Sequence, residues 1–527
     1  MTSSHQAPTQ HNRRTFLRLA GGGALAAGAL PLLQACGDDA DDSGGASQSD
    51  LLIIAHAQGI PTLDPDLTAA DVPHSVIMEV CEPLLDFDPA SRQLQPRLAE
   101  EWSYVDDLTL ELKLKSGVTF SNGEPFNAEA VKFSLDRTQD PATKSVNTIF
   151  ANVDSVQVVD ELTVRWHLAQ PEALLTQYLS VWPILPPQYT TEDPGRLATA
   201  LVGTGPYKVK TFSAGYEVLL ERNETYWGTA PAYREVSYRT IDSAETQMSA
   251  LLSGEVQIAA DLLPQQAQSL ESNETVQIVS KPKLLLAYVT MDSRGRTDPD
   301  GPLTDKRVRQ AINQAVDVDS IIDNLLLGYG TRIGSIAHPA QFGFDESVAP
   351  WPYDPSTAQR LLAEAGYADG FELRMISQTA GITAQAEAAQ AIQRDLEAVG
   401  LQVSLETMTD PTAVGQVVRG GEAGPLFQFG NAARGIFDVG AGLSSFTSDS
   451  PFSYFDNPEF MTLYQEQAVT LDPDRRQVIL GDLQRLLHEE APVLFQWAVH
   501  AIWAVSDQVS WPGHEGRYSR LYTAKPA

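Results

Sequence analysis

The chain has 527 residues, which is too long for one simple hydrophobic core and favours roughly two to three domains. Hydrophobic residues make up 43% and charged residues 20%, which are ordinary proportions for a globular protein. The formal net charge is −32 at pH 7. Such a charge repels phosphate groups, so it argues against nucleic-acid binding and against lying flat on anionic lipid.

The N-terminal segment is basic and then apolar, with the sequence "RRTFLRLAGGGALAAGALPLLQAC" at 13–36. Its apolar run is shorter than the roughly 20 residues of a membrane-spanning helix, so the layout is that of an export signal. Arg13 and Arg14 with the following "TFLR" resemble a twin-arginine signal, and "LQAC" resembles a bacterial lipoprotein processing site. Residues 1–35 are therefore expected to be a twin-arginine lipoprotein signal that leaves Cys36 lipidated. An ordinary cleaved signal with an incidental cysteine is the alternative.

Residues 36–50 form the next segment, which after Cys36 reads "GDDADDSGGASQSD". It is acidic, rich in glycine and serine, and has no large apolar residue to bury, so a disordered tether is expected. The second cysteine, Cys81, lies in the apolar stretch "SVIMEVCEPLL" and is expected to be a small core residue. If Cys36 carries lipid, no disulfide can form within the chain.

The first half of the remaining chain contains predicted strands, turns and capped helices. An apolar strand is expected at 51–57, before a loop rich in glycine and proline. Residues 108–114, "LTLELKL", alternate apolar and polar side chains, which is the period of a half-buried strand. Asn122-Gly123 predicts a tight turn, and Asn127 is the expected N-cap of the following helix.

The second half alternates helices with strands. Asp354 and Gly366 are expected to cap the two ends of one helix, which a strand follows. A helix over 384–399 is expected to stop at Gly400, before a strand at 401–408. This alternation favours an α/β lobe with a largely parallel sheet. Near the C-terminus, another capped amphipathic helix precedes the apolar strand-like stretch "VLFQWAVHAIWAV".

Four stretches, in order along the chain, resemble one family, the extracytoplasmic solute-binding proteins of the peptide/nickel type (family 5) of ATP-driven importers. They are "LQPRLAEEWSYVDDLTLELKLKSGVTFSNGEPFNAEAVKFSLDR" (94–137), "VGTGPYKVKTFSAGYEVLLERNETYWGTAP" (202–231), "LTDKRVRQAINQAVDVDSII" (303–322) and "YDPSTAQRLLAEAGY" (353–367). One such stretch alone is unspecific, whereas four in family order are specific.

The resemblance implies an α/β fold of the periplasmic-binding-protein type II, a two-lobed clamp of three subdomains with a hinge between the lobes. Lobe I is expected over residues 51–285 plus 498–527, and lobe II over 286–497. The resemblance also implies a monomer without enzyme activity, cofactor or metal. It further implies that the protein captures an oligopeptide or another small organic solute and delivers this solute to the permease and ATPase subunits of an importer. The expected location is the outer face of the cytoplasmic membrane, on the cell-surface or periplasmic side.

The resemblance places ligand contacts in three segments: the loop after the first strand, the crossings between the lobes, and a loop rich in glycine and aromatic residues in lobe II. The residues expected there are Gln58, Gly59, Phe429, Asn431, Arg434, Phe437, Asp438 and Trp497. Core packing is an equally good interpretation for the three aromatic residues among them.

The lobe II loop leaves two interpretations open. Peptide-binding relatives usually carry an aspartate in this loop that pairs with the α-amine of the peptide, and here the sequence is "NAARGIFD". Asp438 is either a structural aspartate, with Arg434 facing an anionic or hydroxyl-bearing ligand, or it takes the amine itself. The first interpretation is favoured, and it weakens the prediction that the ligand is a peptide.

Other functions remain as alternatives at this stage. They are a receptor for an anionic, sugar or metal-chelate ligand, a sensor without transport, and a secreted hydrolase. A serine hydrolase is disfavoured because the sequence has no G-x-S-x-G motif, and a metalloprotease because it has no H-E-x-x-H motif.

Overall fold

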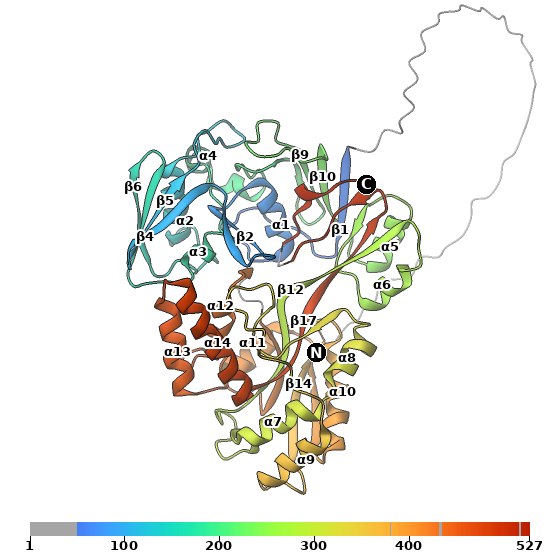
Figure 1. Cartoon of the computed structure of the whole chain (residues 1–527). Coiled ribbons are helices and arrows are strands. Elements are labelled where there is room, and N and C mark those ends of the chain that lie inside the picture. The colour runs from blue at the N-terminus through green and yellow to red at the C-terminus, as the bar shows by residue number, and fades with distance from the viewer. Residues whose placement is uncertain (1–49, 380, 432–434, 516–517) are drawn as a thin grey trace, which may run out of the picture. The chain divides into compact units, whose positions relative to one another are not determined.

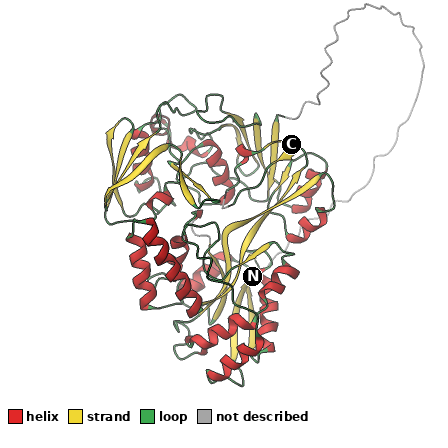
Figure 2. Ribbon diagram, in the orientation of Figure 1, coloured by secondary structure: helices red, strands yellow, loops and turns green. Residues whose placement is uncertain are grey.

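The computed structural model describes residues 50–379, 381–431, 435–515 and 518–527. None of the helices in this part of the chain is long and apolar enough to cross a membrane. Figure 1 shows the two longest strands, β12 (Val276–Met291) and β17 (Val493–Ser506), running together through the described residues. Helices flank the strands on several sides, as the colouring of Figure 2 shows.

The other elements follow in chain order. The strands are β1 (Leu51–His56), β2 (Leu85–Asp88), β3 (Gln93–Pro96), β4 (Ala99–Asp106), β5 (Thr109–Leu114), β6 (Val153–Asp160), β7 (Thr163–Leu168), β8 (Tyr207–Ser213), β9 (Glu217–Arg222), β10 (Glu235–Thr240), β11 (Ile258–Ala259), β13 (Gly330–Arg332), β14 (Glu372–Gln378), β15 (Gln402–Met408), β16 (Leu426–Asn431), β18 (Val509–Ser510) and β19 (Lys525–Pro526). The α-helices are α1 (Asp71–Val80), α2 (Ala128–Gln139), α3 (Leu175–Tyr178), α4 (Pro187–Glu192), α5 (Ala244–Leu252), α6 (Pro264–Leu270), α7 (Lys306–Ala315), α8 (Val318–Leu325), α9 (Pro355–Glu364), α10 (Gln385–Ala398), α11 (Pro411–Gly420), α12 (Val439–Leu443), α13 (Pro458–Val469) and α14 (Pro473–Glu490).

An eleven-stranded sheet extends through both lobes, with the strand order β15-β14-β16-β12-β17-β11-β1-β10-β9-β8 and β13 paired to β17 outside this path. We use lobe I for residues 51–285 and 498–527, and lobe II for residues 286–497, the bounds expected from the sequence. The strands before β12 in this order belong to lobe II, and those after β17 belong to lobe I. The long strands β12 and β17 therefore join the lobes.

The antiparallel pairing of β12 with β17 is interrupted at the boundary between the lobes. Val276 to Pro282 pair in sequence with Ser506 to His500, and pairing resumes with Leu286 opposite Ala498. The residues between form an irregularity of the β-bulge kind, which bends a strand locally. Pro282 at its edge has no N–H to donate to the ladder, so few hydrogen bonds hold this point of β12.

Lobe I contains a second, four-stranded antiparallel sheet with the order β4-β5-β7-β6. β5 forms where the sequence predicts a strand, because Leu110 and Leu112 alternate into the core. α2 packs against this sheet and begins at Asn127, whose side chain accepts a hydrogen bond from the Ala130 N–H, as the sequence predicts. Cys81, directly after α1, is fully buried, which confirms it as a small core residue.

Lobe II has the parallel arrangement that the helix–strand alternation predicts, because β14 pairs in parallel with both β15 and β16. Asp354 accepts a hydrogen bond from the Thr357 N–H and caps α9, and Pro355 occupies its first position. Gly366 and Gly400, after α9 and α10, have φ of 94° and 101°, the left-handed region that glycine adopts readily. Local sequence signals thus set the ends of these helices.

The C-terminal segment packs on lobe I. The buried carboxyl group of Glu79 in α1 accepts hydrogen bonds from the N–H groups of Leu521 and Tyr522. Arg520 donates to both oxygens of Asp86, at 2.8 and 2.9 Å. The chain therefore begins and ends its described part in the same lobe.

Candidate functional site

Lobe I and lobe II contact each other through side chains as well as through β12 and β17. Phe87 of β2 stacks on Phe437 of lobe II with ring centroids 4.8 Å apart and planes inclined by 9°. Ile436 packs into the hydrophobic core of the four-stranded subdomain of lobe I. The Ala173 N–H donates to the Ala468 carbonyl at 2.9 Å. These contacts correspond to a closed clamp.

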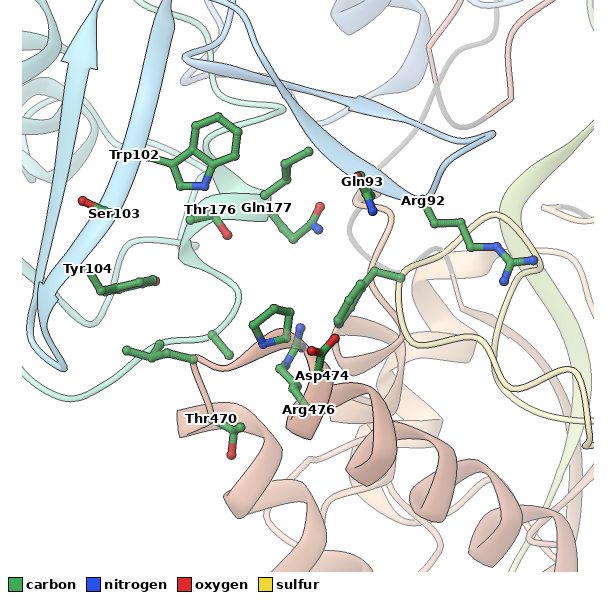
Figure 3. A pocket seen from close by; sticks show the side chains of 15 residues that line it. Arg92, Gln93, Trp102, Ser103, Tyr104, Thr176, Gln177, Thr470, Asp474 and Arg476 are labelled. Carbon is green, nitrogen blue, oxygen red and sulfur yellow. The ribbon is translucent and has the colours of Figure 1, made fainter.

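A cavity of about 470 Å³ lies between the lobes beside these contacts, and Figure 3 shows the side chains that line it. Ligand pockets commonly measure roughly 300–1,000 Å³, so this cavity can hold a small organic molecule. Its lining comes from lobe I (Arg92, Gln93, Leu94, Trp102, Ser103, Tyr104, Ala173, Thr176 and Gln177) and from lobe II (Phe342, Thr470, Leu471, Pro473, Asp474 and Arg476).

The walls of this cavity are largely aromatic and apolar. Trp102 and Tyr104 are two residues apart on β4, so the alternation of the strand places both on the same face. Figure 3 shows them on the lobe I side of the cavity. Phe342 comes from lobe II, where its N–H donates to the Phe437 carbonyl at 2.9 Å. One aromatic face from each lobe therefore borders the space.

A buried ion pair forms the lobe II edge of the cavity. The Arg476 guanidinium donates to both carboxylate oxygens of Asp438, at 2.6 and 2.7 Å. It also donates to the Gln467 side-chain oxygen at 2.9 Å, and Asp438 accepts from the Gly440 N–H at 2.9 Å as the N-cap of α12. Such bidentate contacts are among the stronger protein hydrogen bonds, so both charges are committed to each other.

Among the described residues, two polar groups of the cavity stand out, one because it is buried without a partner and the other because it carries a charge without one. Gln177 is 5% exposed, and its Oε1 has no hydrogen-bond partner among the described residues. Asp474, in the first turn of α14, is exposed and has no ion-pair or hydrogen-bond partner within the same residues. Figure 3 shows the Gln177 amide and the Asp474 carboxylate on opposite sides of the cavity.

A polar cluster also lies at the boundary between the lobes, where β1 ends. His56 Nδ1 lies 3.7 Å from Asp261 Oδ2, and Lys283 Nζ lies 3.4 Å from Asp261 Oδ1. Burial alone would raise the pKa of Asp261, but the His56 ring and the Lys283 charge hold it well below its usual range. The adjoining cavity measures only about 30 Å³, which is too small for an organic solute.

The structure places the predicted loop residues of lobe I outside the cavity of Figure 3. Gln58 is exposed in the loop after β1. A Cβ at Gly59 would lie 3.0 Å from the Gly215 carbonyl oxygen, so glycine is needed there for a close approach of two backbones. Trp497 is 1% exposed and lies in the core of lobe II, where β12 places Ala287 opposite it.

The predicted residues of the lobe II loop have different environments. Phe429 lies in an aromatic group with Tyr288 and Phe452, at centroid distances of 6.3 and 5.9 Å. Asn431 ends β16, whereas Arg434 lies outside the described residues. Phe437 forms the contact between the lobes and Asp438 the ion pair, so this geometry favours Asp438 as a structural aspartate.

Sequence reasoning missed the residues that line the cavity. Trp102 and Tyr104 alternate in "EWSYV", which is a detectable signal for one aromatic strand face. Gln177 and Asp474 carry no local signal, because a solvated surface position is the ordinary interpretation of either residue. They share an environment because α3 of lobe I and α14 of lobe II line the same cavity.

Comparison with known proteins adds a family to this geometry. Residues 93–457 match the family described as bacterial extracellular solute-binding proteins, family 5 Middle. The glutathione-binding protein GsiB of Pectobacterium atrosepticum is 29% identical over 459 residues, covering 84% of this chain and 87% of that protein.

Two solved structures show the same fold. HbpA2 from Haemophilus parasuis has a TM-score of 0.81 at 21% identity and covers 90% of this chain and 100% of its own. NikA from Brucella suis, in complex with Fe(III)-EDTA, has a TM-score of 0.78 at 25% identity, with the same two coverages. Together with the family match, the shared fold confirms the predicted fold class, a two-lobed clamp of type II.

Proposed function

This chain belongs to the bacterial extracellular solute-binding proteins of family 5, and we propose that it is the lipid-anchored receptor of one importer, holding its solute in the cavity between the lobes. Members of the family bind solutes for ATP-driven importers outside the cytoplasm and are not enzymes. The observation that carries the proposal is a cavity of about 470 Å³ lined from both lobes. A solute in it contacts both lobes only when they are closed.

The two-strand connection supports a hinged clamp. β12 and β17 join the lobes, and the ladder between them is interrupted after Pro282. Rotation at this point changes few backbone dihedral angles. Moving such a clamp from 1:99 to 99:1 in favour of closure takes about 5.5 kcal/mol of preferential binding. Contacts of one solute with both lobes supply that preference.

Lipid anchoring is part of the proposal and is supported by the sequence. Arg13 and Arg14 direct export, and Cys36 receives the lipid. One acyl chain holds a protein only weakly, so stable retention uses more than one. The tether at 36–50 has a root-mean-square reach of roughly 20 Å, which keeps the receptor at a high effective concentration near its permease.

We propose a solute about the size of a short peptide. The cavity volume supports this size, and the similarity to a protein named for glutathione binding supports a peptide-like compound. The loop residues Gln58, Gly59, Phe429 and Asn431 do not line this cavity, so they stay proposed contacts only for a solute that extends beyond it. The pairing of Asp438 with Arg476 supports the alternative, in which Arg434 binds an anionic, sugar or metal-chelate ligand.

Native mass spectrometry of the freshly purified protein tests this function. We expect a retained small molecule, whose uptake is lost when the gene is deleted and restored by the complementing gene. In a thermal-shift assay, the same compound at 100 times its dissociation constant adds about 2.7 kcal/mol of apparent stability. Arg434→Ala removes this shift only if the solute is bound through Arg434. Unchanged uptake of every bound compound in the deletion strain would refute the transport role.

A further inference from the structure

We propose that the cavity of Figure 3 is a subsite for an organic cation, that is, an ammonium or guanidinium group carried on an apolar or aromatic body. This subsite rests on the proposed function, since both lobes line it. The cationic group is the part of the solute that would lie between β4 and α3 on one side and α14 on the other.

The cationic side chains of the cavity are already paired. Arg476 donates to both oxygens of Asp438 and to Gln467. Arg92 donates to Glu346 at 3.1 Å. A carboxylate or phosphate on the solute would meet two arginines whose charges are each already balanced by a carboxylate, and the Asp438 pair is buried. The cavity is therefore poorly suited to an anion.

The buried Gln177 Oε1 and the charged Asp474 carboxylate, which have no partner among the described residues, are hydrogen-bond acceptors, whereas Gln93, Ser103 and Thr176 carry groups that can donate as well as accept. Within the described residues, neither the Asp474 carboxylate nor Gln177 Oε1 receives a hydrogen bond. An unpaired buried acceptor is costly, and an N–H from a bound molecule removes that cost. The Tyr104 hydroxyl donates to the Glu172 carbonyl at 3.3 Å, so its oxygen also remains an acceptor. A group with several N–H donors satisfies this set.

The aromatic walls favour the same chemistry. Trp102, Tyr104 and Phe342 line the space, and a cation is attracted to the face of an aromatic ring. Leu94 and Pro473 add apolar surface for the body of the ligand. A formal charge of −32 also raises the local concentration of cations.

In this subsite Asp474, and not Asp438, is the carboxylate that binds the cation. Asp438 and Asp474 belong to neighbouring parts of lobe II, but Asp438 is fully buried against Arg476 whereas Asp474 is exposed and unpaired. An amine that enters the cavity therefore meets Asp474 as its available carboxylate.

A pair of matched probes tests this chemistry on the purified protein. Phenethylamine and 3-phenylpropionate share a phenyl ring on a two-carbon chain and differ in the sign of their charge. Calorimetric titration gives the affinity of each. Binding in the cavity should change the tryptophan fluorescence of the wild type. Loss of this change in Trp102→Phe shows that the probe binds beside Trp102. Asp474→Asn removes one charge at nearly constant shape, and Glu459→Gln is the control, an exposed acid in the first turn of α13 that does not line the cavity.

We expect the amine to bind at least about tenfold more tightly than the acid, because the charge-assisted hydrogen bond to Asp474 is available only to the amine. Asp474→Asn lowers the affinity for the amine by about tenfold, Gln177→Met lowers it severalfold, and Glu459→Gln leaves it unchanged.

Equal or tighter binding of the acid overturns the subsite, as does no detectable binding of the amine or an unchanged affinity in Asp474→Asn. Each of these results leaves the proposed transport function standing, because uptake of an uncharged or anionic solute would be unaffected. Conversely, normal probe binding with no solute-dependent uptake refutes the transport function alone.

Discussion

Replacing Asp438 with asparagine separates a structural role of this residue from a role in ligand binding. Asp438 is 0% exposed and Arg476 is 4% exposed, and two hydrogen bonds of 2.6 and 2.7 Å join them. Asparagine keeps the shape but removes the charge, and its amide N–H₂ would face a guanidinium that has only donors. Removing one partner of a buried ion pair typically costs about 3–5 kcal/mol. We therefore expect Asp438→Asn to lower the free energy of unfolding by about that amount.

Urea unfolding followed by circular dichroism, with linear extrapolation, measures this loss. Asp482→Asn is the control, because the Asp482–Arg485 pair lies on α14 but is about half exposed on both sides, and such pairs contribute about 0–1 kcal/mol. If Asp438 does not contact the solute, the solute should raise the melting temperature of Asp438→Asn by the same amount as that of the wild type. A loss below about 1 kcal/mol, together with an abolished shift, would refute this reasoning and assign Asp438 to the ligand.

Three further outcomes are expected. Burial raises the pKa of Glu79 from 4.5 to about 8. Between these two pH values the unfolded chain has lost the proton and the folded chain still holds it. The free energy of unfolding therefore falls as the pH rises, by up to about 1.4 kcal/mol per pH unit. Urea midpoints measured across pH 5 to 8 check this, and Glu79→Gln should remove that part of the slope. Gln177→Met should stabilise the solute-free protein by about 1 kcal/mol, because it removes a buried acceptor without a partner; destabilisation in the same melts would mean that the acceptor is satisfied. Cys36→Ser should move the protein from the membrane fraction to the soluble fraction on cell fractionation, whereas Cys81→Ser should not; retention of both would exclude the lipid anchor.

The sequence was sufficient for the local structure because the signals that set helix ends lie within a few residues of each other. Asn127 and Asp354 cap helices through N–H groups three residues ahead, and Gly400 ends a helix through its own φ. The two-lobed fold was predicted from the family resemblance, which is specific because four stretches occur in family order. The family match confirms this prediction.

The composition of the cavity could not be predicted in the same way. Asp438 is paired with a residue 38 positions further along the chain, and no local pattern links the two. The lobe I lining comes from the β3–β4 region and from α3, and the lobe II lining comes from Phe342 and from residues 470–476. Prediction from the family's loops therefore gave Phe437 and Asp438, which contact the lining residues Phe342 and Arg476 but do not line the cavity themselves. It missed Gln177 and Asp474, which line the cavity.

The direct contacts between the lobes suggest why a solute can decide whether the clamp is closed. The Arg92–Glu346 pair has side chains 35% and 75% exposed, so it contributes about 0–1 kcal/mol. The stack of Phe87 on Phe437 adds about 0.5–1.5 kcal/mol beyond the burial of its surface. These two terms are small against the roughly 5.5 kcal/mol that separates a mostly open from a mostly closed ensemble, and the burial of Ile436 and of the two rings adds to them. The acceptors and aromatic faces of the cavity lie on both sides of the same contact, so a molecule that satisfies them contributes to closure directly.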